Sequence, residues 1–226
     1  MAAEAKEEHV VHLPGGEFVR LVDTMGDDLR VVNAARVSMH KEHTEFEEPA
    51  DARLVGFLGR NGHWTPFSHP QVCLHYKIPI SIARQWFKHM IGLTRNEVSR
   101  RYVKEAPEFY TPPTWRKGAK SIKQGSLDES VDEPDAVSEI YGALMKLCGD
   151  AYEKLLEEGV CAEQARFCLP QSMFTEFWET GSLAAYGRIA SQRIKPDAQR
   201  ETREVAEAVA LLIAPRFPVA WKALTE

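Results

Sequence analysis

The chain has 226 residues, of which 44% are hydrophobic, enough apolar material for one substantial folded core. Twenty-eight Lys and Arg residues stand against 33 Asp and Glu residues, which gives a net charge of −5 and excludes a chain-wide basic field for nucleic acid. The longest stretch without a charged residue, 61–76, contains two prolines and three histidines, so a membrane span is excluded as well.

The N-terminus and the cysteines indicate where the protein works. Residues 1–16 are predicted to be a disordered tail, because acidic residues precede any apolar run and neither a secretory signal nor an Arg-rich transit peptide fits. Residues 17–226 are predicted to be a single domain. The four cysteines, at positions 73, 148, 161 and 168, form no C-x-x-C pair, which favours free thiols and a cytoplasmic protein.

The first part of the chain predicts two strands and two helices. Apolar residues alternate over 17–23, and the acidic pair at 27 and 28 can cap a helix that continues to about Ser38. A polar loop follows over 39–48, and residues 49–60 show the helical pattern again before Asn61 and Gly62 end it. Strict alternation predicts a strand over 71–78.

Helical patterns dominate after Pro79. Apolar residues at helical spacings predict a helix over 80–91, whose opposite face carries Arg84, Gln85, Lys88 and His89. Residues 106–135 are rich in Pro, Gly, Ser and charge, and predict either a mobile surface loop or an active-site flap. Further helices are predicted over 137–155, 162–169, 181–194 and 197–213. The class is therefore mixed α and β with helices in the majority, and the strand order does not follow from the sequence.

A basic stretch is the most unusual feature of the chain. Six cations fall within 21 positions, against acids only at Glu97 and Glu105: Arg84, Lys88, Arg95, Arg100, Arg101 and Lys104. Such a group suits a phosphorylated small ligand, and it also suits a solvated helix face. No phosphate loop, dinucleotide-binding glycine motif or serine-hydrolase elbow accompanies it.

Isolated histidines and arginines offer further candidates. His63, His69 and His75 are each six residues apart, which raises a metal site, although the prolines between them prevent one continuous strand. Arg166 and Arg193 lie in helical neighbourhoods of apolar and small residues, where a guanidinium needs an acid, a carbonyl or a ligand.

From about Glu17 onwards, the sequence resembles the flavin-dependent thymidylate synthases. Their signature is Arg-His-Arg, then seven residues, then Ser-x-Arg-Tyr; here Lys88-His89-Met90 is followed by eight residues and Ser99-Arg100-Arg101-Tyr102. Matching blocks also occur at 34–38, 62–69, 164–170 and 193–199. Lys88 and Met90 replace the two arginines of the signature, and Arg95 is a candidate to bind the anion in their place.

The resemblance implies a fold and a reaction. The fold is an α+β domain in which helices flank a small antiparallel sheet. In the reaction, dUMP is methylated at C5 to dTMP, 5,10-methylenetetrahydrofolate donates the carbon, FAD reduced by NADPH supplies the hydride, and tetrahydrofolate is released. No cysteine nucleophile is expected, because the four cysteines lack the Pro-Cys-Gln setting of the folate-only synthases. Relatives are homotetramers with shared active sites, and their partners are small molecules, with no nucleic acid, membrane or metal.

The resemblance also assigns roles to individual residues. Arg193 is the catalytic candidate, because a fixed guanidinium at the uracil edge would stabilise negative charge developing on the ring. The residues assigned to dUMP are Gln85, Lys88, Glu97, Val98, Ser99, Arg100, Arg101, Arg166 and Arg193. The residues assigned to FAD are Ser38, His63, Thr65, Lys88, His89, Met90, Asn96, Glu97, Ser182, Arg188 and Asp197. Relatives often carry Asn, Asn and His at the last three positions.

Two other classes of function remain open. A non-catalytic nucleotide or RNA-phosphate-binding protein could keep the basic stretch while the changes at Lys88 and Met90 remove flavin chemistry. RNA binders interleave exposed aromatics with their cations, and only Tyr102 is well placed for that here. A metal-dependent hydrolase using His63, His69 and His75 is the third possibility.

Overall fold

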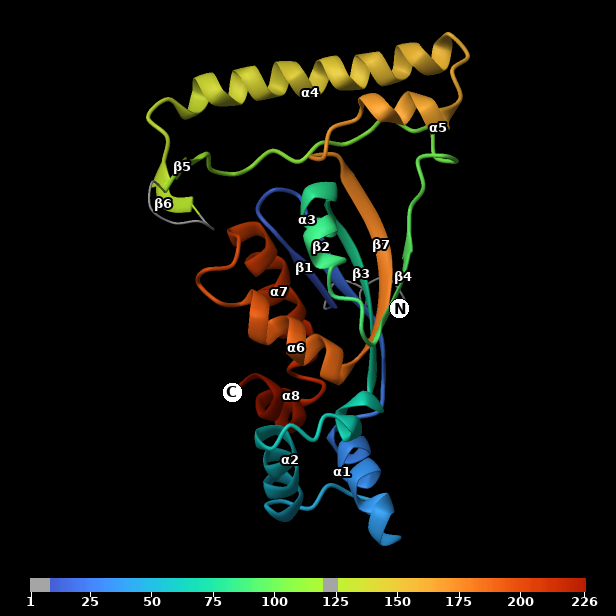
Figure 1. The fold of residues 1–226 in the computed structure, drawn as a ribbon, viewed down its shortest axis with the longest axis vertical. Helices are drawn as coiled ribbons and strands as arrows, with labels where there is room; N and C mark the ends of the chain where they lie inside the picture. Colours follow the sequence, from blue (N-terminus) through green and yellow to red (C-terminus); the bar gives the residue numbers. More distant parts are fainter. Residues whose placement is uncertain (1–8, 120–125) are drawn as a thin grey trace, which may run out of the picture.

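A five-stranded sheet organises the protein, in a computed structural model that describes residues 9–119 and 126–226. Every neighbouring pair is antiparallel, in the order β1-β2-β3-β7-β4 (Figure 1). The strands are β1 (Val10–His12), β2 (Phe18–Met25), β3 (Gln71–Pro79), β4 (Leu93–Glu97) and β7 (Phe174–Ser182). The sheet and its helices confirm the α+β fold class.

The two faces of the sheet differ in polarity. Leu74, Tyr76 and Ile78 on β3 are fully buried, whereas the intervening His75 and Lys77 lie on the other face. Tyr76 stacks on its cross-strand partner Phe177, with ring centroids 4.6 Å apart. One face therefore builds the core, and the other remains available to polar groups.

Helices cover the core face and one end of the sheet. Figure 1 shows α6 and α7 beside the strands, and α1, α2 and α8 grouped at the lower end of the view. Buried apolar residues form one cluster that extends from Val19 to Trp221. The bounds are α1 (Asp28–Arg36), α2 (Ala50–Arg60), α3 (Ile80–Trp86), α6 (Leu183–Arg193), α7 (Arg200–Ile213) and α8 (Pro218–Thr225), with 3-10 turns at Val37–Met39 and Thr65–Ser68.

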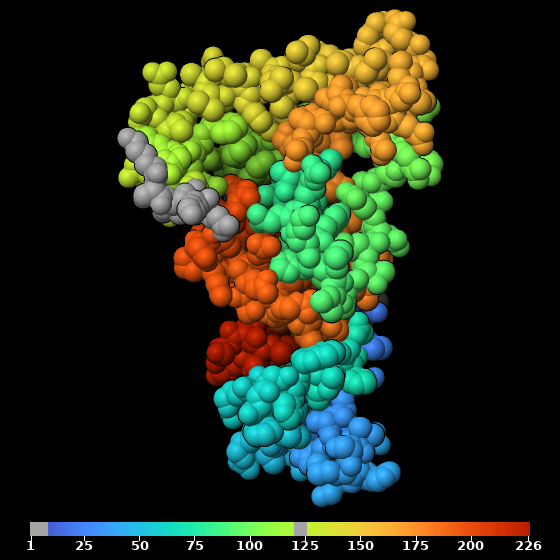
Figure 2. Space-filling model, in the orientation of Figure 1, coloured from blue at the N-terminus to red at the C-terminus, as the bar shows by residue number. Residues whose placement is uncertain are grey.

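The remaining elements form a layer across the other end of the molecule (Figures 1 and 2). They are α4 (Pro134–Glu157), α5 (Ala162–Ala165), a 3-10 turn at Arg166–Cys168, and a hairpin of β5 (Arg116–Gly118) and β6 (Ser126–Ser130). One side of α4 presents Ile140, Leu144 and Leu147 to solvent. Among the helices described, none is both long and apolar enough to cross a membrane.

Several predicted elements are confirmed, with ends shifted by a few residues. The strands predicted over 17–23 and 71–78 are β2 and β3, and the helices predicted up to Ser38, over 49–60 and over 137–155 are α1, α2 and α4. The predicted excursion over 106–135 contains the β5–β6 hairpin, and its bridge from Phe109 to Met173 holds it to the body of the protein.

Other predictions are wrong at their boundaries. The helix predicted over 80–91 ends at Trp86, because the chain turns through Gly92, whose φ is +78°, and enters β4. The helix predicted over 162–169 ends at Ala165 and continues as a 3-10 turn, whereas the helices predicted over 181–194 and 197–213 are confirmed as α6 and α7, which begin at Leu183 and Arg200. The sequence pattern missed β1, β4, β5, β6, β7 and α8.

The predicted tail also needs correction. Val10–His12 is an edge strand that pairs with Phe18, Val19 and Arg20 of β2, so the ordered chain begins before position 17. Residues 1–8 of the predicted tail lie outside the described residues.

Candidate active site

A cavity of about 1110 Å³ lies on the polar face of the sheet. We call it the sheet cavity. Strands β3, β4 and β7 form its floor, and the chain after β4 and the turn at Arg166–Cys168 contribute its walls. Its basic lining residues are His75, Lys77, Arg84, Arg100 and Arg166. Glu105, Glu108 and Glu176 line the cavity too, and Lys77 and His75 pair with Glu108 and Glu176. The three arginines are therefore the groups that suit an anionic ligand.

A second cavity, of about 860 Å³, lies beside the end of α6 and the start of α7. We call it the Arg193 cavity. Gln85, Arg193 and Asp197 line it together with residues of the β5–β6 hairpin. Arg116 of β5 donates to Glu201 of α7 at 2.7 Å, which fastens the hairpin against this cavity. Burial alone would raise the pKa of Glu201. Hydrogen bonds from the backbone amide of Glu201 and from Gln199, together with the Arg116 guanidinium, outweigh burial and lower this pKa.

A third, smaller cavity of about 310 Å³ lies at the N-terminus of α6. We call it the α6 cavity, and Trp64, Ile91, Gly92, Ser182 and Arg188 are among its lining residues. A Cβ at Gly92 would lie 3.1 Å from Ser182 Oγ, so the absent side chain permits this close approach.

His89 is a buried residue that contacts Arg193 of the Arg193 cavity. Its side chain is buried, and its Nε2 accepts a hydrogen bond of 2.9 Å from Nε of Arg193. Burial lowers the pKa of His89 to about 4, and the charges of Arg193, Arg188 and Arg95 lower it in the same direction. The imidazole is therefore neutral at physiological pH, with its proton on Nδ1 and its Nε2 free to accept from Arg193.

Arg95 does not have the role that the sequence suggested. Its Nε donates to Glu179 at 2.5 Å, one of its terminal nitrogens donates to the carbonyl oxygen of His89 at 2.5 Å, and its side chain is 14% exposed. These two bonds hold the guanidinium on the core face of the sheet beside Glu179, whereas positions 88 and 90 are exposed, so it does not lie where arginines at those positions would bind an anion. The prediction that Arg95 replaces the signature arginines is therefore wrong.

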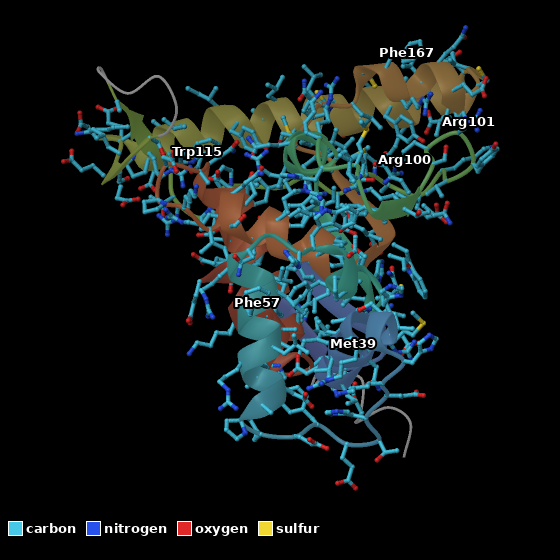
Figure 3. The ribbon with its side chains drawn as sticks, turned by 60° about the horizontal axis from the view of Figure 1, so that its bottom comes forward. Met39, Phe57, Arg100, Arg101, Trp115 and Phe167 are labelled. Atoms are coloured by element: carbon cyan, nitrogen blue, oxygen red, sulfur yellow. The ribbon has the colours of Figure 1, made fainter. Side chains whose placement is uncertain are left out.

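The residues assigned to dUMP divide between two cavities of the single chain. Val98, Arg100 and Arg166 line the sheet cavity, whereas Gln85 and Arg193 line the Arg193 cavity. Figure 3 shows Arg100 and Arg101 near Phe167, at the end of the molecule that carries α4 and α5. One chain therefore does not bring the assigned set together.

The other residues assigned to dUMP are near the protein surface. Lys88 and Glu97 are exposed, and Glu97 accepts a hydrogen bond of 2.7 Å from Thr175. Ser99 begins a tight turn in which its carbonyl oxygen accepts from the amides of Tyr102 and Val103. Arg101 stacks over Tyr102 with its guanidinium 5.0 Å from the ring centroid.

The residues assigned to FAD are also distributed over several places. Ser182 and Arg188 line the α6 cavity, Asp197 lines the Arg193 cavity, and Asn96 lines the sheet cavity. His89 is buried. The exposed members are Ser38, His63, Thr65, Lys88, Met90 and Glu97, with His63 packed edge-on against Phe57. Figure 3 labels Met39 and Phe57 at the end of the molecule that carries α1 and α2, opposite the end with Arg100 and Arg101.

The three evenly spaced histidines do not gather. His75 lies on β3 between Arg20 and Glu176, at 3.0 Å from each, whereas His63 and His69 flank the 3-10 turn at Thr65–Ser68. Across residues 9–119 and 126–226, no three His, Cys, Asp or Glu side chains are grouped to hold a metal ion. The metal-dependent hydrolase therefore has no support in the described part of the chain.

Sequence reasoning missed one charged residue beside the site. Glu179 on β7 is fully buried, and its carboxylate accepts from Tyr76, Trp86 and Arg95. Its signal in the sequence is an acid within the aromatic run Phe177-Trp178-Glu179, where an unpaired carboxylate would be costly.

Comparison with known proteins identifies the family. The family described as "Thymidylate synthase complementing protein" matches residues 20–219, and the chain belongs to it. The flavin-dependent thymidylate synthase of Thermus thermophilus is 41% identical over 209 residues, covering 92% of this chain and 76% of the relative. That of Thermotoga neapolitana is 39% identical over 206 residues, covering 91% and 89%.

A solved structure shows the same likeness. The UMP/dUMP methylase PolB from Streptomyces cacaoi, bound with 5-Br dUMP, superposes with a TM-score of 0.84 at 29% identity. The match covers 95% of this chain and 97% of that PolB chain, so nearly the whole fold is shared.

Proposed function

We propose that this protein methylates dUMP at C5 to give dTMP, as a flavin-dependent thymidylate synthase. In this reaction 5,10-methylenetetrahydrofolate is the carbon donor, FAD is the flavin, and NADPH is the reductant. The observation that carries the proposal is the fixed guanidinium of Arg193, which a buried, neutral His89 holds at a cavity, in a chain of this family.

The residues near the α6 cavity fit a flavin. Arg188 and the N-terminus of α6 suit the diphosphate, and the exposed Trp64, Met90 and Ile91 suit apolar parts of the cofactor. Ser182, Arg188 and His63 would hold the cofactor. When bound, FAD supplies hydride transfer.

The chain's own residues activate and bind the nucleotide in this proposal. Arg193 stabilises negative charge at the uracil edge, which makes C5 nucleophilic without a covalent adduct. Arg100, Arg101 and Arg166 bind the phosphate, and Ser99 orients the nucleotide. None of the four cysteines lines the sheet cavity or the Arg193 cavity, which supports a reaction without a thiol nucleophile.

We further propose a homotetramer with shared sites. The division of the nucleotide residues between two cavities supports this, because an assembly of several copies can bring Arg166 of one copy and Arg193 of another to one nucleotide. The exposed Ile140, Leu144 and Leu147 of α4 offer apolar area for such contacts. The four free cysteines support a cytoplasmic location.

The test is dTMP formation by the purified protein from dUMP, 5,10-methylenetetrahydrofolate and NADPH, with and without added FAD. We expect FAD-dependent product, and we expect Arg193→Ala to lower turnover by about 100-fold while flavin absorbance stays unchanged. Arg216→Ala is the control, because that exposed arginine lies on none of the three cavities described above. Binding of dUMP without product would instead favour a nucleotide-binding protein that has lost flavin chemistry.

A further inference from the structure

We propose that the buried pair of Arg95 and Glu179 is a positioning element for the reaction, which holds His89 so that His89 fixes the guanidinium of Arg193. The inference rests on the proposed function, because it assigns a consequence to the orientation of Arg193. It concerns two residues that do not contact the substrate themselves.

The pair of Arg95 and Glu179 is firmly anchored in the core. Arg95 and Glu179 are cross-strand partners on β4 and β7, and both point to the core face of the sheet. One carboxylate oxygen of Glu179 accepts from Tyr76 Oη at 3.0 Å and Trp86 Nε1 at 3.2 Å, and the other accepts from Arg95 Nε. Both oxygens are used, so the carboxylate has a single orientation.

The anchored guanidinium of Arg95 holds the backbone of the segment between α3 and β4. A terminal nitrogen of Arg95 donates to the carbonyl oxygen of His89, and the guanidinium lies 5.0 Å from the ring centroid of Phe87. Arg188 donates to the carbonyl oxygen of Ile91 at 2.6 Å. The segment between α3 and β4 has no regular secondary structure of its own, and these two arginines hold its backbone from the sheet and from α6.

His89, held in this way, fixes the position of Arg193. The fixed backbone places the imidazole against Trp86, with ring centroids 6.3 Å apart, and its Nε2 accepts from Arg193 Nε. Because Nε is occupied, the two terminal nitrogens of Arg193 remain for the cavity; they make no hydrogen bond to the described residues. The geometry of the catalytic candidate thus depends on a carboxylate that lies in the core.

A purely structural reading is weaker. Buried ion pairs contribute little net stability compared with apolar residues of the same volume, whereas they do fix one geometry. The fork shape of Arg95 is needed here, since a single ammonium group cannot span Glu179 and the His89 carbonyl together.

Arg95→Lys tests the inference, with Tyr186→Phe as the matched control. Lysine keeps the charge that Glu179 needs but cannot reach the His89 carbonyl as well. Tyr186→Phe removes a buried hydroxyl that donates to the backbone carbonyl of Glu179 at 3.2 Å, and it leaves the Glu179 carboxylate and Arg95 with all their partners. We expect Arg95→Lys to lower turnover by about 10- to 100-fold at unchanged flavin content, the effect of a displacement of about 1 Å, and Tyr186→Phe to change it by no more than about threefold. Equal losses in the two variants, or loss of flavin from Arg95→Lys alone, would overturn the inference.

The decisive measurement is the coupling to Arg193. In an Arg193→Ala background, where there is no guanidinium to position, Arg95→Lys should lower the residual turnover by less than about threefold. Multiplication of the two losses would show that Arg95 acts by another route and would overturn the inference.

A crystal structure of Arg95→Lys separates this inference from the proposed function. A broken hydrogen bond between Arg193 Nε and His89 Nε2 supports the positioning role, and an intact one overturns it, whatever the activity. Full turnover of Arg193→Ala would instead contradict the role assigned to Arg193.

Discussion

Acid should destabilise this protein through His89 in particular. The pKa of the folded His89 is about 4, against an ordinary value of 6.5, so the folded chain binds this proton less tightly than the unfolded chain. Above pH 6.5 neither state carries the proton. As the pH falls from 6.5 towards 4, the unfolded chain gains it first, and the free energy of unfolding decreases. The full loss is about 3 kcal/mol, and most of it is reached by pH 4.5.

The assay compares the wild type with His89→Gln at equal flavin content. Glutamine is neutral at every pH, and its amide oxygen can accept from Arg193, so the difference between the two melting curves isolates His89. Between pH 7.5 and 4.5 the wild type should lose about 5–10 °C more in melting temperature than the variant. If the two melting temperatures fell in parallel with pH, the low pKa of His89 and its causes would be refuted.

Five other substitutions test the nucleotide site and the packing. Ser99→Ala should weaken dUMP binding about tenfold in a titration without abolishing turnover, because the hydroxyl orients the nucleotide and is not a nucleophile; lost turnover with intact binding would contradict this. Asp28→Ala should lower the free energy of unfolding, measured by chemical denaturation, by about 2–4 kcal/mol, because two backbone amides of α8 lose the carboxylate that accepts from them at 2.9 Å. Asp27→Ala, which removes only the exposed cap of α1, should lower it by about 1 kcal/mol. Gly59→Ala should lower the melting temperature, because a Cβ there would meet a carbonyl oxygen of α8 at 2.2 Å. Gly142→Ala, in open space on α4, should instead stabilise the protein by about 0.5–1 kcal/mol. A more stable Gly59→Ala variant and a less stable Gly142→Ala variant would contradict the packing of α2 on α8.

The contrast between β3 and β7 explains which strands could be predicted. The buried face of β3 is apolar, so its alternation is visible in the sequence. The buried face of β7 carries Thr175, Phe177 and Glu179, and only Phe177 is apolar. The polar members are satisfied by Glu97 and Arg95 on the adjacent β4, and that pairing cannot be known before the strand order is known.

The same reason limits what the sequence says about the site. His89 and Arg193 could both be selected as candidates, but they are 104 positions apart, and their hydrogen bond depends on how α6 crosses the sheet. Arg95 was assigned to an anion because it belongs to a basic stretch. The fold instead turns it to the core face, opposite to its neighbour Asn96 on the same strand.

The exposure of the signature triplet explains why its ends can vary while its centre is kept in this chain. Lys88 and Met90 point into solvent, with Met90 71% exposed, whereas His89 between them is 8% exposed. Replacing an arginine at either end therefore removes no internal contact and leaves no buried charge unpaired. The centre is different, because any other side chain there must accept from Arg193 while it fills a buried space against Trp86. Folding of the single chain thus constrains position 89, and a constraint on positions 88 and 90 can come only from groups bound at the surface.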